Sequence, residues 1–186
     1  NNPNGLRFIQ GSAERPFVFS DNSFEFVTCF DVLEHLKNPV AALREVYRIL
    51  KPGGRALFHM PVSDFGGTMD WLTSRLQPEK WAESMKEAGH DYSYILTRAG
   101  YVKAAQEAGF EILFSRRFNS LFQNIFDYHL VHRLLNRLFY RWKVPFFYYH
   151  RVVAPLIELG VSFDRVLQKA DIGGSTYLGV RKRQEP

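Results

Sequence analysis

The stretch that most constrains the fold of this chain runs from Phe24 to Val62. It begins with an apolar run, Phe24–Phe30, which favours a strand covered on both faces, as in a parallel sheet. Asn38 can cap a following amphipathic helix, and the turn Lys51–Gly54 can end it. A second apolar strand, Ala56–Val62, comes next. This order predicts one βαβ unit and therefore an α/β fold.

Three side chains that can do chemistry follow the first of these strands: Asp31, Glu34 and His35. In open α/β sheets, ligands bind beyond the carboxyl ends of the strands. His35 is the candidate catalytic base, because an imidazole exchanges its proton near neutral pH. Two carboxylates and an imidazole could also hold a divalent cation, or could only fix the loop. We assign no metal ligand here.

The rest of the chain indicates further strands and helices. In chain order these are a strand at Leu6–Gln10, helices at Gly66–Gln77 and Glu79–Ala88, a helix from Thr97 to Ala108 ended by Gly109, and strands at Phe110–Phe118 and Ser175–Arg183. Apolar anchors are expected at Trp71, Leu72, Leu76 and Trp81, and a buried helix face at Tyr101, Val102 and Ala105. The first two helices should lie over the carboxyl end of the sheet, as a lid over substrate.

Composition places the chain in a broad class. Its 186 residues, 46% hydrophobic and 23% charged, suit one soluble globular domain with a sizeable core. Cys29 is the single cysteine, which excludes an intrachain disulfide and a multi-cysteine zinc site. No apolar run has the ~18 residues that a membrane-spanning helix requires. We expect a cytoplasmic location.

Residues 119–170 differ from the rest because aromatic and aliphatic residues alternate with arginine and lysine. Pro145 and Pro155 should divide this segment into about three helices. Three interpretations stay open: a helical cap on the domain, a surface that docks on an anionic membrane, or an RNA-binding surface. The last is the weakest, because no RNA-binding motif is present. We therefore expect no nucleic-acid partner.

Several strings together resemble one family. They are GSAE (Gly11–Glu14), SDNSFEFV (Ser20–Val27), DVLEHL (Asp31–Leu36), LKPGG (Leu50–Gly54), EAGF (Glu107–Phe110) and the closing GGSTYLGVRKR. In this order and spacing they are similar to the S-adenosylmethionine-dependent methyltransferases with a Rossmann-like fold. The likeness covers nearly the whole chain except residues 119–170, which would be a helical aromatic-basic insertion before the last strand.

The resemblance implies a three-layer α/β sandwich whose first strand, helix and strand are lacking here, so that residues 1–186 form a single partial domain. We expect Leu6–Gln10 either to pair directly with Phe24–Phe30 or to be poorly placed. It also implies particular site residues. Those implied to contact S-adenosylmethionine are Gly11, Ser12, Ala13, Glu14, Phe30, Asp31 and Val32, with the Ala13 N–H and the Ser12 side chain facing the adenine. His90 is the residue implied to bind substrate.

The function that follows is methyl transfer from S-adenosylmethionine to a small-molecule or lipid-like acceptor, on oxygen. The alternative is a non-catalytic membrane- or partner-binding module on a degenerate methyltransferase fold. A nicotinamide dehydrogenase shares the fold but gains no support from DVLEHL or LKPGG. We expect the 186 residues alone to be inactive and to bind S-adenosylmethionine weakly or not at all.

Overall fold

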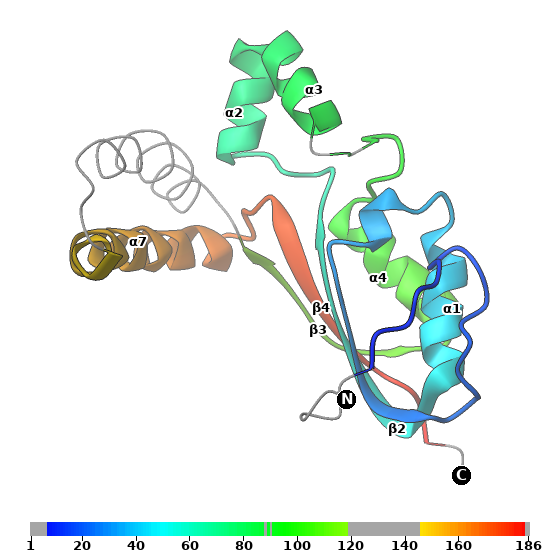
Figure 1. Ribbon diagram of the computed structural model, residues 1–186. Helices are drawn as coiled ribbons and strands as arrows, with labels where there is room; N and C mark the ends of the chain where they lie inside the picture. The colour runs from blue at the N-terminus through cyan, green and yellow to red at the C-terminus, as the bar shows by residue number, and fades with distance from the viewer. Residues whose placement is uncertain (1–6, 88, 90, 119–145, 185–186) are drawn as a thin grey trace.

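A mixed four-stranded sheet organises the computed structural model, which describes residues 7–87, 89, 91–118 and 146–184 (Figure 1). The strands are β1 (Phe24–Phe30), β2 (Leu50–Pro61), β3 (Glu111–Phe118) and β4 (Ser175–Arg181), in the spatial order β1-β2-β4-β3. β1 and β2 run parallel, while β4 is antiparallel to both of its neighbours. The predicted α/β class is confirmed.

The predicted βαβ unit is present. β1 has the expected bounds, and α1 (Pro39–Ile49) begins after Asn38, whose side chain accepts a hydrogen bond from Ala41 N at 3.2 Å. The second strand begins earlier than expected, at Leu50, because this residue already pairs with Phe24. The next paired residues are Phe26 and Arg55, so Lys51–Gly54 bulges out of β2 instead of separating it from α1.

Two helices cover one face of the sheet. α1 and α4 (Arg98–Glu107) lie side by side against it in Figure 1. Thr97 caps α4 by accepting from Gly100 N at 3.0 Å, and Gly109 follows its end with a φ of +102°, as predicted. The buried face of α4 contains Tyr101 and Ala105 as expected, and Ala104, whereas Val102 is only half-buried. The core between helices and sheet includes Leu43, Val46, Phe58, Leu178 and Val180.

The opposite face of the sheet is open over the part of the chain that the structure describes. Phe26 and Phe30 of β1 are 55% and 48% exposed, so the prediction that this strand is covered on both faces is wrong. Burial alternates along β1 because α1 and α4 both pack on one side of the sheet. Phe114 and Tyr177 are exposed on β3 and β4.

The two predicted lid helices are present with shorter bounds. α2 (Met69–Leu76) and α3 (Pro78–Glu87) stand beyond the carboxyl end of β2, apart from the sheet (Figure 1). Three of the four predicted apolar anchors are wrong, because Trp71, Leu72 and Leu76 are 40%, 37% and 70% exposed. Trp81 alone packs inward, with its ring stacked 5.8 Å from that of Phe65. Neither helix has a buried residue, since the two pack mainly on each other.

Two further predictions are corrected at the ends of the fold. Arg7–Gln10, the described part of the predicted strand Leu6–Gln10, is exposed and forms no strand. It pairs with no edge of the sheet, and a strand without a partner has no ladder to hold it.

α7 (Phe146–Lys169) continues through Pro155, where a break was expected. A proline removes one backbone hydrogen bond, and a 24-residue helix keeps its others. The remainder of the 119–170 segment, with Pro145, lies outside the described residues. Within the described part of the chain, no helix is both long and apolar enough to cross a membrane.

Candidate functional site

A cavity of about 250 Å³ lies between the lid and the carboxyl ends of the parallel strands. Its polar lining comes from Asp31 after β1, His59 of β2 and Asp70 of α2. The remaining lining residues are Pro61, Val62, Phe65, Trp81, Met85, Tyr92, Ile95, Gly174 and Ser175. The cavity thus lies at the edge of the sheet where α/β proteins bind their ligands.

One wall of this cavity is aromatic. Phe65, Trp81 and Tyr92 contact one another with ring centroids 5.0 to 5.8 Å apart. Within the described residues, the Trp81 Nε1 and the Tyr92 hydroxyl are buried without a hydrogen-bond partner. Burial, followed by the negative charges of Asp70 and Asp64, raises the pKa of Tyr92, which keeps its hydroxyl protonated. The wall therefore contains two buried hydrogen-bond donors that have no partner in the described chain.

Asp31 and His59 make polar contacts with each other in the lining of the cavity. The Asp31 N–H donates to the His59 carbonyl oxygen at 3.0 Å, and Asp31 Oδ1 lies 2.9 Å from His59 Nδ1. Asp31 has a φ of +53°, which turns the chain sharply at the end of β1. The rings of Phe118 and Tyr177 lie 4.7 and 5.0 Å from the imidazole. His59 Nε2 is buried and has no hydrogen-bond partner in the described part of the chain.

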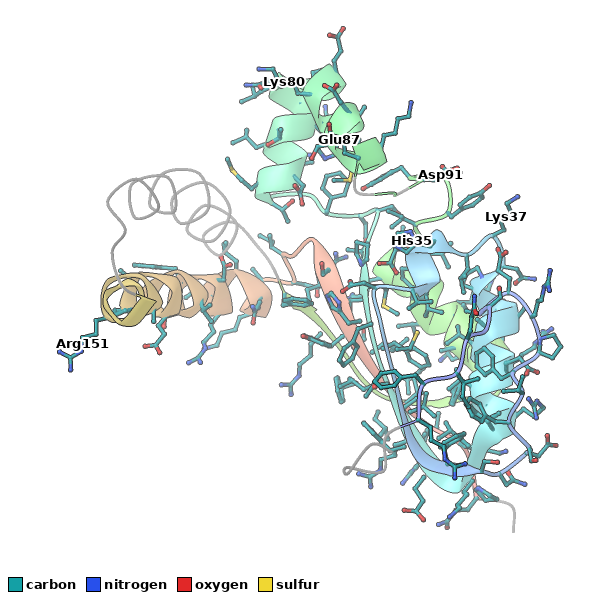
Figure 2. The ribbon with its side chains drawn as sticks, in the orientation of Figure 1. His35, Lys37, Lys80, Glu87, Asp91 and Arg151 are labelled. Carbon is teal, nitrogen blue, oxygen red and sulfur yellow. The ribbon has the colours of Figure 1, made fainter. Side chains whose placement is uncertain are left out.

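Glu34 and His35 lie elsewhere. Both belong to the short helix η1 (Leu33–His35), and neither lines the cavity. His35 lies beneath the loop that carries Asp91 (Figure 2), with its Nδ1 3.2 Å from the Gly89 carbonyl oxygen. Glu34 is fully buried, and this burial raises the pKa of its carboxyl group. The structure thus separates His35 from Asp31 and His59, and its role as catalytic base stays a prediction.

No group of three or more histidine, cysteine, aspartate or glutamate residues that could hold a metal ion occurs among the described residues. The implied substrate ligand His90 lies outside them.

The predicted cofactor loop, Gly11–Glu14, lies beside the loop that follows β1. Ser12 Oγ accepts a hydrogen bond from Glu14 N at 3.2 Å, and Glu14 Oε1 accepts one from Lys37 N at 3.4 Å. Gly11 and Ser12 are exposed, and no atom lies within 4 Å of the Cβ that a side chain at Gly11 would add. A second cavity of about 220 Å³ adjoins Gly11, Ser12 and Ala13. The contact of this loop with adenine stays a prediction.

His59 is the residue that the sequence prediction missed. A signal for it exists, because His59 is the only polar side chain in the apolar stretch Ala56–Val62. Its position in the strand puts it on the same face as Leu57 and Pro61, opposite the helices. Trp81 and Tyr92 were not recognised as cavity residues, since their meeting depends on how α3 and the loop after it fold together.

Comparison with known proteins agrees with the fold. Residues 1–58 match the family model for a methyltransferase domain. The chain superposes on Haemonchus contortus phosphoethanolamine N-methyltransferase 2 in complex with S-adenosyl-L-methionine with a TM-score of 0.57, at 21% identity, over 90% of this chain and 35% of that one. Residues 1–58 are thus similar to a methyltransferase domain, and the chain shares the fold of a class I methyltransferase. A putative methyltransferase from Bacillus halodurans gives a TM-score of 0.51 at 24% identity, over 96% of this chain and 78% of that chain.

The curated relatives match this chain over part of their length. Ubiquinone biosynthesis O-methyltransferase of Vibrio cholerae is 25% identical over 109 residues, which are 56% of this chain and 43% of the relative. Cycloartenol-C-24-methyltransferase 1 of Oryza sativa is 29% identical over 99 residues, 53% of this chain and 27% of that protein. The chain therefore spans less than half the length of these relatives.

The fold itself does not fix the reaction. The [4+2]-cyclase SpnF has a TM-score of 0.55 with this chain, at 20% identity, over 98% of this chain and 58% of its own. The chemistry of this chain must be argued from its own site.

Proposed function

We propose that the protein transfers a methyl group from S-adenosylmethionine to a small-molecule acceptor that binds in the cavity under α2 and α3. The observation that carries this proposal is the position of Asp31. Its backbone lies at the end of β1, where the family resemblance puts the cofactor, and its side chain lines the cavity. Asp31 would therefore contact the cofactor through its backbone and lie beside the acceptor in the cavity, which brings the two molecules close together.

The residues of this chain would act mainly by alignment. S-adenosylmethionine supplies an already activated methyl group when it is bound. Gly11–Glu14 would contact its adenine, and Phe30, Asp31 and Val32 would line it from the end of β1. The cavity would hold the acceptor at a fixed angle and exclude water from it, which is the larger part of what such a transfer requires. His90 remains the predicted contact to substrate, and His35 a predicted base.

We further propose that the methylated atom is oxygen. The support comes from the O-methyltransferase named among the relatives and from the polar atoms of the cavity. The aromatic wall of Phe65, Trp81 and Tyr92 suits an acceptor with an apolar body. This would also accommodate one end of a lipid-like molecule.

Association of this cytoplasmic protein with an anionic membrane is part of the proposal. Leu159, Phe163 and Val166 of α7 are 49%, 50% and 66% exposed and follow one another at helical spacing. Arg165 and Lys169 are exposed on the same helix. Such a helix can lie in a lipid interface, where each basic side chain adds about 1 kcal/mol.

Sedimentation with vesicles tests this association. The protein should sediment with phosphatidylserine vesicles and stay in solution with phosphatidylcholine vesicles. The double variant Phe163→Ser/Val166→Ser should lose the binding, while Ser162→Ala on the same helix should keep it. Equal sedimentation of all variants would contradict the membrane role of α7.

A second candidate is a binding module without methyl transfer. The exposed Phe26, Phe30 and Phe114 on the open face of the sheet favour it, because exposed apolar patches mark interaction surfaces. The full-length product of the gene discriminates the two candidates. Calorimetry should detect binding of S-adenosylmethionine, and methyl-labelled cofactor should label small molecules of a cell extract. Absence of both signals would overturn the enzymatic proposal and leave the binding module.

A further inference from the structure

We infer that His59, oriented by Asp31, is the catalytic base that takes the proton from a hydroxyl group of the acceptor. The inference rests on the proposed function, and assigns the proton transfer to a residue that neither the sequence motifs nor the family resemblance indicates. Asp31 is the positioning residue of the pair.

Asp31 contacts His59 at two places, the backbone carbonyl group and the imidazole ring. The Asp31 N–H donates a hydrogen bond to the His59 carbonyl oxygen at 3.0 Å, and Asp31 Oδ1 lies 2.9 Å from His59 Nδ1. A carboxylate only accepts hydrogen bonds, so in the neutral ring Nδ1 carries the proton and donates it to Asp31. Nε2 then has a free lone pair. The pair is therefore arranged for Nε2 to accept a proton.

The surroundings of the ring support this assignment. Phe118 and Tyr177 pack on the imidazole, and the His59 side chain is 16% exposed, so the ring is held in one orientation. Over the described residues, Nε2 has no hydrogen-bond partner although it is buried. An unpaired buried nitrogen destabilises the protein, and a ligand that donates a hydrogen bond to it would remove this cost.

The cavity also defines the chemistry of the ligand. Trp81 and Tyr92 line the same cavity as His59, and the Trp81 Nε1 and the Tyr92 hydroxyl are two donors buried without partners in the described chain. A ligand that complements the three atoms has one O–H group and a further acceptor oxygen. The volume of about 250 Å³ suits a molecule of roughly one substituted ring, since an apolar cavity of about 150 Å³ holds benzene.

The transfer balances with this base. The acceptor O–H bond breaks, its proton passes to Nε2, and its electron pair stays on oxygen. The oxygen forms the new bond to the methyl carbon as the sulfur–methyl bond breaks and leaves its electrons on sulfur. The negative charge of Asp31 stabilises the imidazolium that results.

Nuclear magnetic resonance tests the tautomer without any turnover. In long-range ¹H–¹⁵N spectra of the full-length protein, His59 should show a protonated Nδ1 and an unprotonated Nε2. Asp31→Asn should shift the population toward the other tautomer, and addition of 4-methylphenol should shift the Nε2 resonance of the wild type. A protonated Nε2 in the wild type, or a tautomer that Asp31→Asn leaves unchanged, would overturn the inference even if methyl transfer occurs.

Kinetic measurements distinguish a role of His59 as catalytic base from a purely structural role of this residue. At about pH 8, 4-methylphenol keeps its proton because such phenols ionise near pH 10, whereas 4-nitrophenol is largely ionised and needs no base. His59→Asn should lower transfer to 4-methylphenol by about 10²–10⁴-fold and transfer to 4-nitrophenol much less. His59→Gln serves as a second variant if His59→Asn does not fold. His35→Asn tests the competing base predicted from the sequence, and the ratio of the two rates should stay at the wild-type value only if His59 is the base.

The outcomes distinguish the inference from the proposed function. Equal losses on both phenols for His59→Asn, or selective loss for His35→Asn, would refute the role of His59 while methyl transfer stands. If the wild-type protein binds no S-adenosylmethionine, the proposed function fails, and the tautomer measurement still decides whether Asp31 orients His59.

Discussion

Arg117 of β3 holds Asp64 at two points: its Nη1 donates to the Asp64 carbonyl oxygen at 2.9 Å, and its Nη2 pairs with the Asp64 carboxylate. The other carboxylate oxygen of Asp64 accepts a hydrogen bond from Arg98 N, at 3.0 Å, where α4 begins. Arg117 is 8% exposed and also donates to the Gly173 carbonyl oxygen at 3.1 Å. One buried guanidinium thus joins β3, the loop that leads to the lid, and the start of α4.

Replacement of Arg117 by methionine should therefore destabilise the protein strongly. The change leaves the Asp64 carboxylate and two carbonyl oxygens without their cationic donor, and a hydrogen bond to a charged group contributes about 1.5–3 kcal/mol. Urea unfolding followed by circular dichroism measures this loss. Arg116→Met is the control, because Arg116 is exposed and lies over the ring of Phe114, and it should cost less than about 0.5 kcal/mol. Similar losses for the two variants would contradict the role assigned to Arg117.

Substitution of Gly173 by alanine should also be costly. A Cβ at this position would lie 2.6 Å from the carbonyl oxygen and 2.9 Å from the amide nitrogen of Phe118, and backbone atoms in a sheet cannot move away cheaply. We expect a loss of about 1–3 kcal/mol in the free energy of unfolding. Gly66→Ala is the matched control, since no atom lies within 4 Å of its added Cβ. If both variants unfold at the same urea concentration, the close approach to Phe118 is not a real constraint.

Loss of the N-terminal cap of α1 should have a smaller effect on stability. Asn38→Ala removes the acceptor for Ala41 N and should cost about 1 kcal/mol of stability. Asn38→Asp keeps an oxygen at the same position and should retain nearly all of the stability. Thermal unfolding of the three proteins decides this, and an aspartate variant as unstable as the alanine variant would show that the side-chain acceptor is not what stabilises the helix.

The elements that could be predicted from sequence are those whose ends are marked by local chemistry. Asn38, Thr97 and Gly109 determine where α1 and α4 begin or end through contacts a few residues away, and both helices were predicted closely. The apolar residues of α2 predicted the helix correctly, but they did not predict which of its side chains are buried. Trp71 and Leu76 are exposed because no other part of the described chain covers that side of the lid.

The same distinction holds for the site. Asp31 could be found because it ends a strand, and the end of a parallel strand is a ligand site in any α/β sheet. His59 stands out in the sequence only as a lone polar side chain in an apolar stretch, since its importance depends on contacts with Asp31, Phe118 and Tyr177, which come from three other parts of the chain. β4 pairs between β2 and β3, and this brings Phe118 and Tyr177 next to His59. No local sequence pattern predicts this order of the strands.

The buried carboxyl group of Glu34 should give the protein an unusual dependence of stability on pH. Burial raises its pKa in the folded state above the ordinary value of 4.5, while the charge of His35 opposes the shift and that of Asp31 adds to it. Below pH 4.5 the carboxyl group is protonated in both states and contributes its full stability. As pH rises past this value, the unfolded chain releases the proton first, so stability falls until the folded pKa is passed.

Glu34→Gln should remove this part of the dependence, because an amide does not titrate. Unfolding midpoints of the wild type and the variant, measured in steps from about pH 4 to about pH 8, should therefore diverge in favour of the variant as pH rises. Glu45→Gln is a control of opposite sign. The hydrogen bond from Arg48 holds the pKa of Glu45 below its ordinary value, so this carboxylate stabilises the fold above that value and loses its effect as pH falls. Glu45→Gln should thus lower the midpoint at neutral pH and approach the wild type in acid. Parallel curves for wild type and Glu34→Gln would mean that Glu34 is ionised in the folded protein.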